Sequence, residues 1–280
     1  MLTAARRIDS HLHVWDLAVS QYDWLTPQHD SLYASWSPAQ AECELQAAGF
    51  SGAILVQAED SRRDTRYLLG IAGQNPWVLG VVGWVQLDDP VRAAQDLDEF
   101  CRWTAFCGVR HLINDDLRAD FLDQKPVRES LALLAGRGLP FDLHDAWPRH
   151  LQQAERLAEE LPELTLIIDH LGLPPRNNDD IGAWTESMAR LAQLPNTVAK
   201  ISGLGHPGAG VEPEALRLIW NTGLELFGPD RLMYGGNWPI TVPTGGYSAH
   251  WQAISELIGE LDLADQARIL SSTAERIYRL

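Results

Sequence analysis

The sequence predicts an α/β fold, a (β/α)8 TIM barrel that spans residues 1–280 as a single domain. Eight short runs rich in β-branched residues recur along the chain, each followed by a stretch long enough for a helix. Such alternation produces a parallel sheet, and barrels of this kind reach about 250 residues with one core. An open doubly wound sheet is the alternative, but the chain lacks the glycine-rich phosphate loop that such folds often use for a dinucleotide.

Turn residues bound each of the predicted strands, and two of the segments between them carry clear helix signals. Residues 37–49, SPAQAECELQAAG, offer a serine cap, a proline in the first turn and a closing glycine. Residues 148–162, PRHLQQAERLAEELP, repeat apolar side chains at helical spacing. The eight runs begin, in order, at Arg7, Ala53, Val78, Phe106, Pro140, Leu164, Asn196 and Arg231.

The net charge of the chain argues against two classes of binding partner. The formal net charge is −16 and the sequence pI is about 4.8, so the chain repels a nucleic-acid backbone and an anionic membrane surface. Neither is expected as a partner, whereas a small-molecule substrate is, and a homo-oligomer is left open. The first residues lack a signal-peptide core and no apolar run reaches the roughly 18 residues of a membrane span. These features predict a cytoplasmic protein.

The three cysteines, Cys43, Cys101 and Cys107, have no metal-ligand spacing, and an odd number argues against a disulfide framework. We expect buried thiols.

Two loop-rich segments, residues 16–37 and 206–212, are predicted to cap the barrel mouth. The first contains Tyr22, Trp24, Tyr33 and Trp36. Such aromatic side chains can pack on the face of a sugar, although a structural cap is their more common role.

The first strand carries a His-x-His pair. Asp9, His11 and His13 alternate with Ile8, Ser10 and Leu12, so both imidazoles should point into the barrel from one face. Such a pair can chelate a metal or hold an oxyanion, but it can also be a pair of buried, hydrogen-bonded histidines. Its place in the first strand of a barrel favours function.

The sixth run ends in His170, directly before the helix-breaking LGLPP, which is where a barrel places functional groups. Asp169 has the opposite parity and is expected to be a structural partner rather than the base.

Further polar residues near strand ends are candidates for substrate binding. Arg110 could hold a carboxylate or lactone oxygen, or form a surface salt bridge. Lys200 could stabilise an anionic substrate or oxyanion, or sit in a buried ion pair. Asp142 and His144 share one parity and can face inward. The remaining candidates for the pocket wall are Gln57, Glu59, Trp84 and Gln86.

The strings RIDSHLHVWD, GVRH, IIDHLG, VAKISGL and LMYGGNWPI, in this order across nearly the whole chain, resemble the second amidohydrolase family. The resemblance is closest to its sugar-lactone and dicarboxylate-lactone hydrolases, such as fuconolactonases, rhamnonolactonases and pyrone dicarboxylate lactonases. It implies that His11, His13 and His170 polarise a lactone carbonyl and that Arg110 grips the substrate. It also implies either no cofactor or one divalent metal, zinc or manganese, with His11 and His13 among its ligands.

The sequence departs from this family at Asn237, where the family usually has an aspartate that takes a proton from water. An amide cannot do so, and losing a general base costs about 10² to 10⁴ in rate. Three explanations are open: another base such as a histidine, a weak or different activity, or an engineered Asp-to-Asn change.

We therefore expect a hydrolase that opens a small lactone of a sugar acid or a dicarboxylic acid to the hydroxy acid. Water would attack from the side of Asn237, through an oxyanion held by imidazolium groups or by a metal. One alternative is a metal-dependent hydrolase or decarboxylase of the same superfamily. The other is a ligand-binding protein with vestigial activity.

Overall fold

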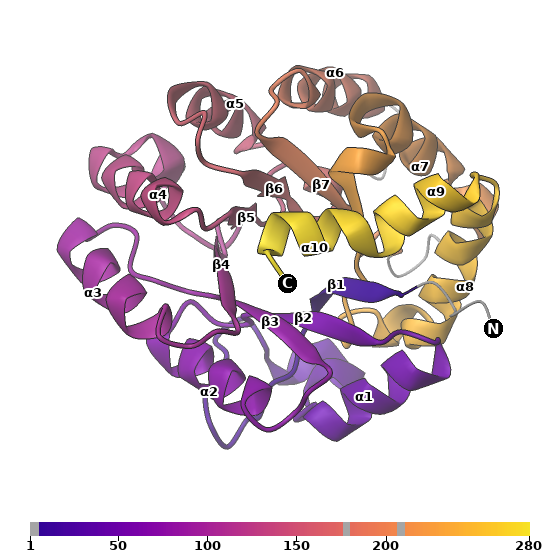
Figure 1. Ribbon diagram of the computed structural model, residues 1–280, viewed down its shortest axis with the longest axis horizontal. Coiled ribbons are helices and arrows are strands. Elements are labelled where there is room, and N and C mark those ends of the chain that lie inside the picture. The colour runs from indigo at the N-terminus through magenta and orange to yellow at the C-terminus, as the bar shows by residue number, and fades with distance from the viewer. Residues whose placement is uncertain (1–5, 176–179, 206–210) are drawn as a thin grey trace.

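The structure, a computed structural model, describes residues 6–175, 180–205 and 211–280. Eight parallel strands form one sheet in the order β1 to β8, wrapped into a nearly closed barrel (Figure 1). The predicted (β/α)8 barrel is confirmed. The strands are β1 Ile8–Leu12, β2 Gly52–Val56, β3 Val78–Gly83, β4 Phe106–His111, β5 Phe141–Leu143, β6 Leu166–Ile168, β7 Thr197–Ile201 and β8 Leu232–Tyr234.

Helices surround the sheet, and the last of them lies across one end of the barrel (Figure 1). Within the described residues, none is long and apolar enough to cross a membrane. They are α1 Pro38–Ala47, α2 Arg62–Ala72, α3 Pro90–Phe100, α4 Lys125–Arg137, α5 Leu151–Glu160, α6 Ile181–Ala192, α7 Pro213–Phe227, α8 Gly246–Gly259, α9 Leu263–Ala267 and α10 Thr273–Tyr278.

The capping residues act where the sequence predicts them. Ser37 accepts a hydrogen bond from the backbone of Gln40 and Pro38 opens α1, which satisfies an amide that the first helical turn leaves free. In α5 the apolar positions Leu151, Ala154 and Leu157 are buried. The periodic pattern therefore faces the sheet, as expected.

α10 closes the end of the barrel where the strands begin. A compact apolar cluster joins Ile8, Ile54 and Met233 of three strands to Ala274 and Tyr278 of α10. Strands from around the barrel can share such a cluster only in its interior. Since α10 covers the amino-terminal end, we expect the site at the carboxyl ends of the strands, the end that barrel enzymes use.

The strands are shorter than the predicted runs because the backbone turns sharply at several polar residues. Just beyond β5, β6 and β8, respectively, Asp145, His170 and Asn237 have φ angles of 38°, 56° and 49°. This left-handed region is uncommon for residues other than glycine. The turns lift these side chains out of the sheet and toward the mouth of the barrel.

A bulge in β1 overturns one expectation. The register with β2 shifts between Asp9 and Leu12, so Asp9 and His11 do not share a face. Asp9 points instead toward α8, where the Tyr247 hydroxyl donates to Oδ2 at 2.8 Å. Its Oδ1 accepts from the backbone amides of His11 and Gly236, each at 2.9 Å. Asp9 therefore ties β1 to the segment after β8 and closes the barrel.

The cysteines agree only in part with the prediction. Cys107 is buried, but Cys43 and Cys101 are exposed. Cys43 lies on the outer side of α1, whose buried positions are Ala41 and Leu45, and Cys101 caps α3.

Asp9 should give stability a pH dependence of its own. Burial raises the pKa of its carboxyl to about 6, whereas the pKa of an aspartate in an unfolded chain is about 3.9. The folded form therefore loses stability as pH rises from about 4 to 6, by up to about 3 kcal/mol for this group. We expect Asp9→Asn to lack this decline in urea unfolding experiments across that range. Parallel stability curves for the two proteins would contradict the assignment.

Candidate active site

A cavity of about 380 Å³ opens at the carboxyl ends of the strands, within the size range of small-molecule sites. Aromatic side chains form part of its wall and polar groups converge from five strand ends. The lining residues include His13, Trp15, Trp24, Leu32, Arg110, Asp115, His144, Asp145, His170, Gly203 and Asn237.

The first cap prediction agrees with the structure. Trp24 and Leu32 of segment 16–37 line the cavity, and the Trp24 indole donates to the Ala58 carbonyl at 2.6 Å. Tyr22 is fully buried and donates to Asp64 at 3.1 Å. Of the second predicted cap, residues 206–210 lie outside the described residues.

The paired histidines point inward together, as predicted. Nε2 of His11 lies 3.1 Å from Nε2 of His13, and the His11 and His170 rings are 4.6 Å apart at their centroids. His13 donates from Nδ1 to the Val56 carbonyl at 2.7 Å, which leaves a lone pair on its Nε2. His13 and His170 line the cavity, while His11 is fully buried beneath them.

Burial lowers the pKa of His11, His13 and His170. Nearby cations act in the same direction, Lys200 on His11 and Arg110 on His13. All three rings are therefore neutral at physiological pH. The expected imidazolium groups are not available, although a neutral ring still donates one hydrogen bond.

Lys200 does not line the cavity. It is fully buried, and its Nζ lies 2.5 Å from Asp142, 3.1 Å from Asp169 and 3.1 Å from Nδ1 of His11. Although burial opposes the charge, Asp142 and Asp169 raise the pKa of Lys200. Tyr278 of α10 donates to Asp142 at 2.9 Å from below. Of the two roles left open for Lys200, the structure has the buried ion pair.

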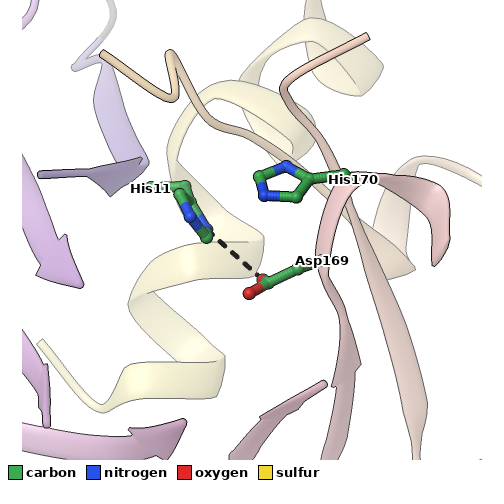
Figure 2. A group of neighbouring side chains, drawn as sticks. All are labelled: His11, Asp169 and His170. Atoms are coloured by element: carbon green, nitrogen blue, oxygen red, sulfur yellow. Dashed lines mark ion pairs between the residues drawn. The ribbon is translucent and has the colours of Figure 1, made fainter. Parts of the chain in front are cut away.

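Asp169 lies on the same side as His11 and His170, contrary to the expectation from strand parity (Figure 2). Alternation ends with β6 at Ile168, and residues Asp169–Gly172 form a short helical turn with left-handed His170. Asp169 Oδ1 is 3.3 Å from Nδ1 of His11. Burial opposes its ionisation, but Lys200 and His11 hold the pKa of Asp169 well below its usual value. It is an ionised structural partner of His11.

Two predicted wall residues support loops instead of lining the cavity. Gln57 is buried and donates to Asp60 at 3.0 Å, and the Trp84 indole donates to His111 at 3.2 Å. Both follow the last residue of their strands, Val56 and Gly83. Beyond a strand end the alternating pattern no longer fixes direction.

Arg110, His144 and Asn237 line the cavity as expected. Asp145, which sequence reasoning passed over, lies beside them, and the only signal for it was its position directly after His144 at a strand end. Each of these four residues has a buried polar atom without a hydrogen-bond partner among the described residues: Arg110 Nε, His144 Nδ1, Asp145 Oδ1 and Asn237 Oδ1. Unpaired buried atoms are costly and mark where a ligand or water binds.

Gly203 is required where His170 and Asn237 converge. Its φ is 59°, and a Cβ there would lie 2.7 Å from Nδ2 of Asn237 and 2.9 Å from Nδ1 of His170. Any side chain would push these two groups apart.

The described residues gather His11, Asp169 and His170 with ligand atoms within 4.8 Å of one another. The atoms that could hold a metal already face fixed cations, however. Lys200 contacts His11 Nδ1 and Asp169 Oδ1, while Arg110 Nη1 lies 3.4 Å from His11 Nε2 and 3.7 Å from Asp169 Oδ2. Unit charges about 4 Å apart repel by about 4 kcal/mol at an effective dielectric constant of 20. This charge arrangement does not fit a divalent ion.

Removing the Lys200 ammonium should destabilise the barrel. Lys200→Met removes the cation beside Asp142 and leaves Asp169 with Arg110 at 3.7 Å, and breaking a buried pair in this way typically costs about 3–5 kcal/mol. We expect a loss of about that size in the free energy of unfolding, measured with urea at pH 7. Lys200→Met combined with Asp142→Asn should recover part of it. A loss below about 1 kcal/mol for the single variant would show that the pair does not hold the site.

Comparison with known proteins places these features in context. The amidohydrolase family model matches residues 8–280. The chain is 31% identical to L-fucono-1,5-lactonase of Burkholderia ambifaria over 98% of this chain and 96% of that protein. Two crystal structures of an amidohydrolase from Burkholderia multivorans, one with HEPES and one with zinc bound, have TM-scores of 0.90 and 0.87. Each is 27% identical and covers 99% of this chain and 100% of its own.

Proposed function

The chain belongs to the amidohydrolase family, and we propose that it hydrolyses a neutral sugar-acid lactone, of the L-fucono-1,5-lactone type, to the open hydroxy acid. The observation that carries this proposal is the set of unpaired polar atoms around the cavity. Arg110 offers a donor and Asn237 offers an acceptor. A polyhydroxylated ring can satisfy such a mixed set, because each hydroxyl both donates and accepts.

The charge of the wall favours a neutral sugar lactone over a dicarboxylate. Arg110 is the single lysine or arginine among the described lining residues, whereas Asp115 and Asp145 are carboxylates. A dianionic substrate would therefore meet more negative than positive charge. Trp24, which is half-buried, supplies apolar surface on which the carbon face of a sugar ring would pack.

Arg110 and His170 are positioned to stabilise the oxyanion that forms when water adds to the lactone carbonyl. The guanidinium is fixed by a hydrogen bond to the Gln57 carbonyl, so its charge is oriented before substrate binds. His170 Nδ1 lies 2.7 Å from the Ser202 hydroxyl. With that hydroxyl donating, Nε2 keeps its hydrogen and donates toward the carbonyl.

No metal takes part in this scheme. Lys200 and Arg110 already supply positive charge beside His11 and Asp169. We also propose a cytoplasmic location for the protein.

A lactone panel tests the function. We expect the protein, or its Asn237→Asp variant, to hydrolyse neutral sugar-acid 1,5-lactones with kcat/KM at least tenfold above that for dicarboxylate lactones. Acid release is followed with a pH indicator and corrected for spontaneous opening. If neither protein accelerates any lactone while the cavity still binds one, the ligand-binding alternative is correct.

Chelation tests the metal. Activity after dialysis against EDTA should stay within about twofold of the untreated protein, and added zinc or manganese should not raise it. Metal content measured on the same samples shows whether an ion was present. Loss of activity with EDTA and its return with one metal would establish the metal-dependent alternative.

A further inference from the structure

We propose that His144 is the general base of the reaction, held in place by Asp145, and that it replaces the carboxylate that Asn237 lacks. This inference rests on the proposed lactone hydrolysis. The two residues follow β5, whereas Asn237 follows β8. The inference depends on the contacts of His144 and Asp145.

His144 follows directly after the last residue of β5, Leu143. The left-handed turn at Asp145, with φ of 38°, brings the carboxylate back against its neighbour, so that Oδ2 lies 3.1 Å from Nε2 of His144. Such a backbone conformation is uncommon for a residue other than glycine, and it is typical of sites that over-determine geometry for function.

This contact fixes the imidazole tautomer. Nε2 carries the hydrogen that is donated to Asp145, which leaves a lone pair on Nδ1. Nδ1 is buried and has no hydrogen-bond partner among the described residues. A carboxylate behind an imidazole both orients the ring and stabilises the imidazolium that forms when the ring accepts a proton. Asp145 is therefore a positioning residue.

The dyad also lies beside the group that would bind the carbonyl. The ring centroids of His144 and His170 are 6.4 Å apart, and His144, Asp145 and His170 all line the same cavity. The two rings meet edge to face, so a water molecule beside a carbonyl held by His170 would also lie beside His144.

The other candidate bases of the cavity are engaged or unsuited. His13 donates from Nδ1 to Val56 and directs Nε2 at His11. Asp115 is exposed to solvent, where a carboxylate is a weak base. Asn237 cannot accept a proton at neutral pH. His144 is the lining histidine that combines a carboxylate partner with an unpaired nitrogen.

His144 carries one proton from the attacking water to the leaving ring oxygen. The water oxygen forms a bond to the lactone carbonyl carbon while one water proton moves to Nδ1 of His144. The bond between that carbon and the ring oxygen then breaks, and the ring oxygen takes the proton from the imidazolium. The product is the open hydroxy acid, and His144 is neutral again.

Kinetics with the lactone that the panel identifies test the proposal. His144→Gln and His144→Ala should each lower kcat by about 10² to 10⁴ with KM changed by less than about threefold. Imidazole added to the buffer should restore part of the activity of His144→Ala, a response that a purely structural defect would not give. Asp145→Asn should also lower kcat with KM little changed, but imidazole should not rescue it. Glu159→Gln, at an exposed position of α5, is the control and should keep native kcat.

The outcomes separate this inference from the proposed function. The role of His144 is overturned if His144→Gln keeps kcat within about threefold of the native value. It is also overturned if imidazole does not restore activity to His144→Ala. Lactone hydrolysis stands in both cases. If the native protein is inactive and Asn237→Asp is active, the role of His144 is also overturned, because the native protein would then lack a general base. If neither the native protein nor Asn237→Asp hydrolyses any lactone, both proposals fail.

Discussion

The buried ion pair of Lys200 with Asp142 and Asp169 is the interaction on which the rest of the site depends. A single ammonium in the barrel interior is compensated by two carboxylates, one on β5 and one in the turn after β6, with separations of 2.5 and 3.1 Å. Such a group is costly to bury and more costly to leave half paired. The arrangement therefore fixes the ends of β5, β6 and β7 relative to one another, and α10 supports it from below through Tyr278.

The buried charges of Lys200 and Asp169 affect the protonation of the histidines in the site. Lys200 and Asp169 flank Nδ1 of His11, and burial keeps the three site histidines neutral. Positive charge in the cavity wall is then limited to Arg110 among the described residues. In the proposed reaction, hydrogen bonds and one guanidinium would stabilise the oxyanion, and a divalent ion would be repelled by Lys200 and Arg110.

Left-handed turns at Asp145, His170 and Asn237 set the positions of the side chains around the cavity. Each turn takes the chain out of the sheet within a few residues of a strand end. The side chains are thereby gathered over the mouth of the barrel, supported by rigid strands. The same turns place Asp145 against His144, a pairing between adjacent residues that an extended strand would forbid because their side chains would point to opposite faces.

The alternation of strand and helix signals was enough to predict the barrel, and the sequence also placed five residues near strand ends: His11, His13, Arg110, His170 and Asn237. Those inferences succeeded because hydrophobic periodicity fixes where strands lie and which end carries function. Only the tertiary structure decided the direction of Asp9 and Asp169 and the burial of Lys200. A bulge and a helical turn break the two-residue period locally, and the partners of a buried ammonium come from strands far away in the chain, which no local pattern records.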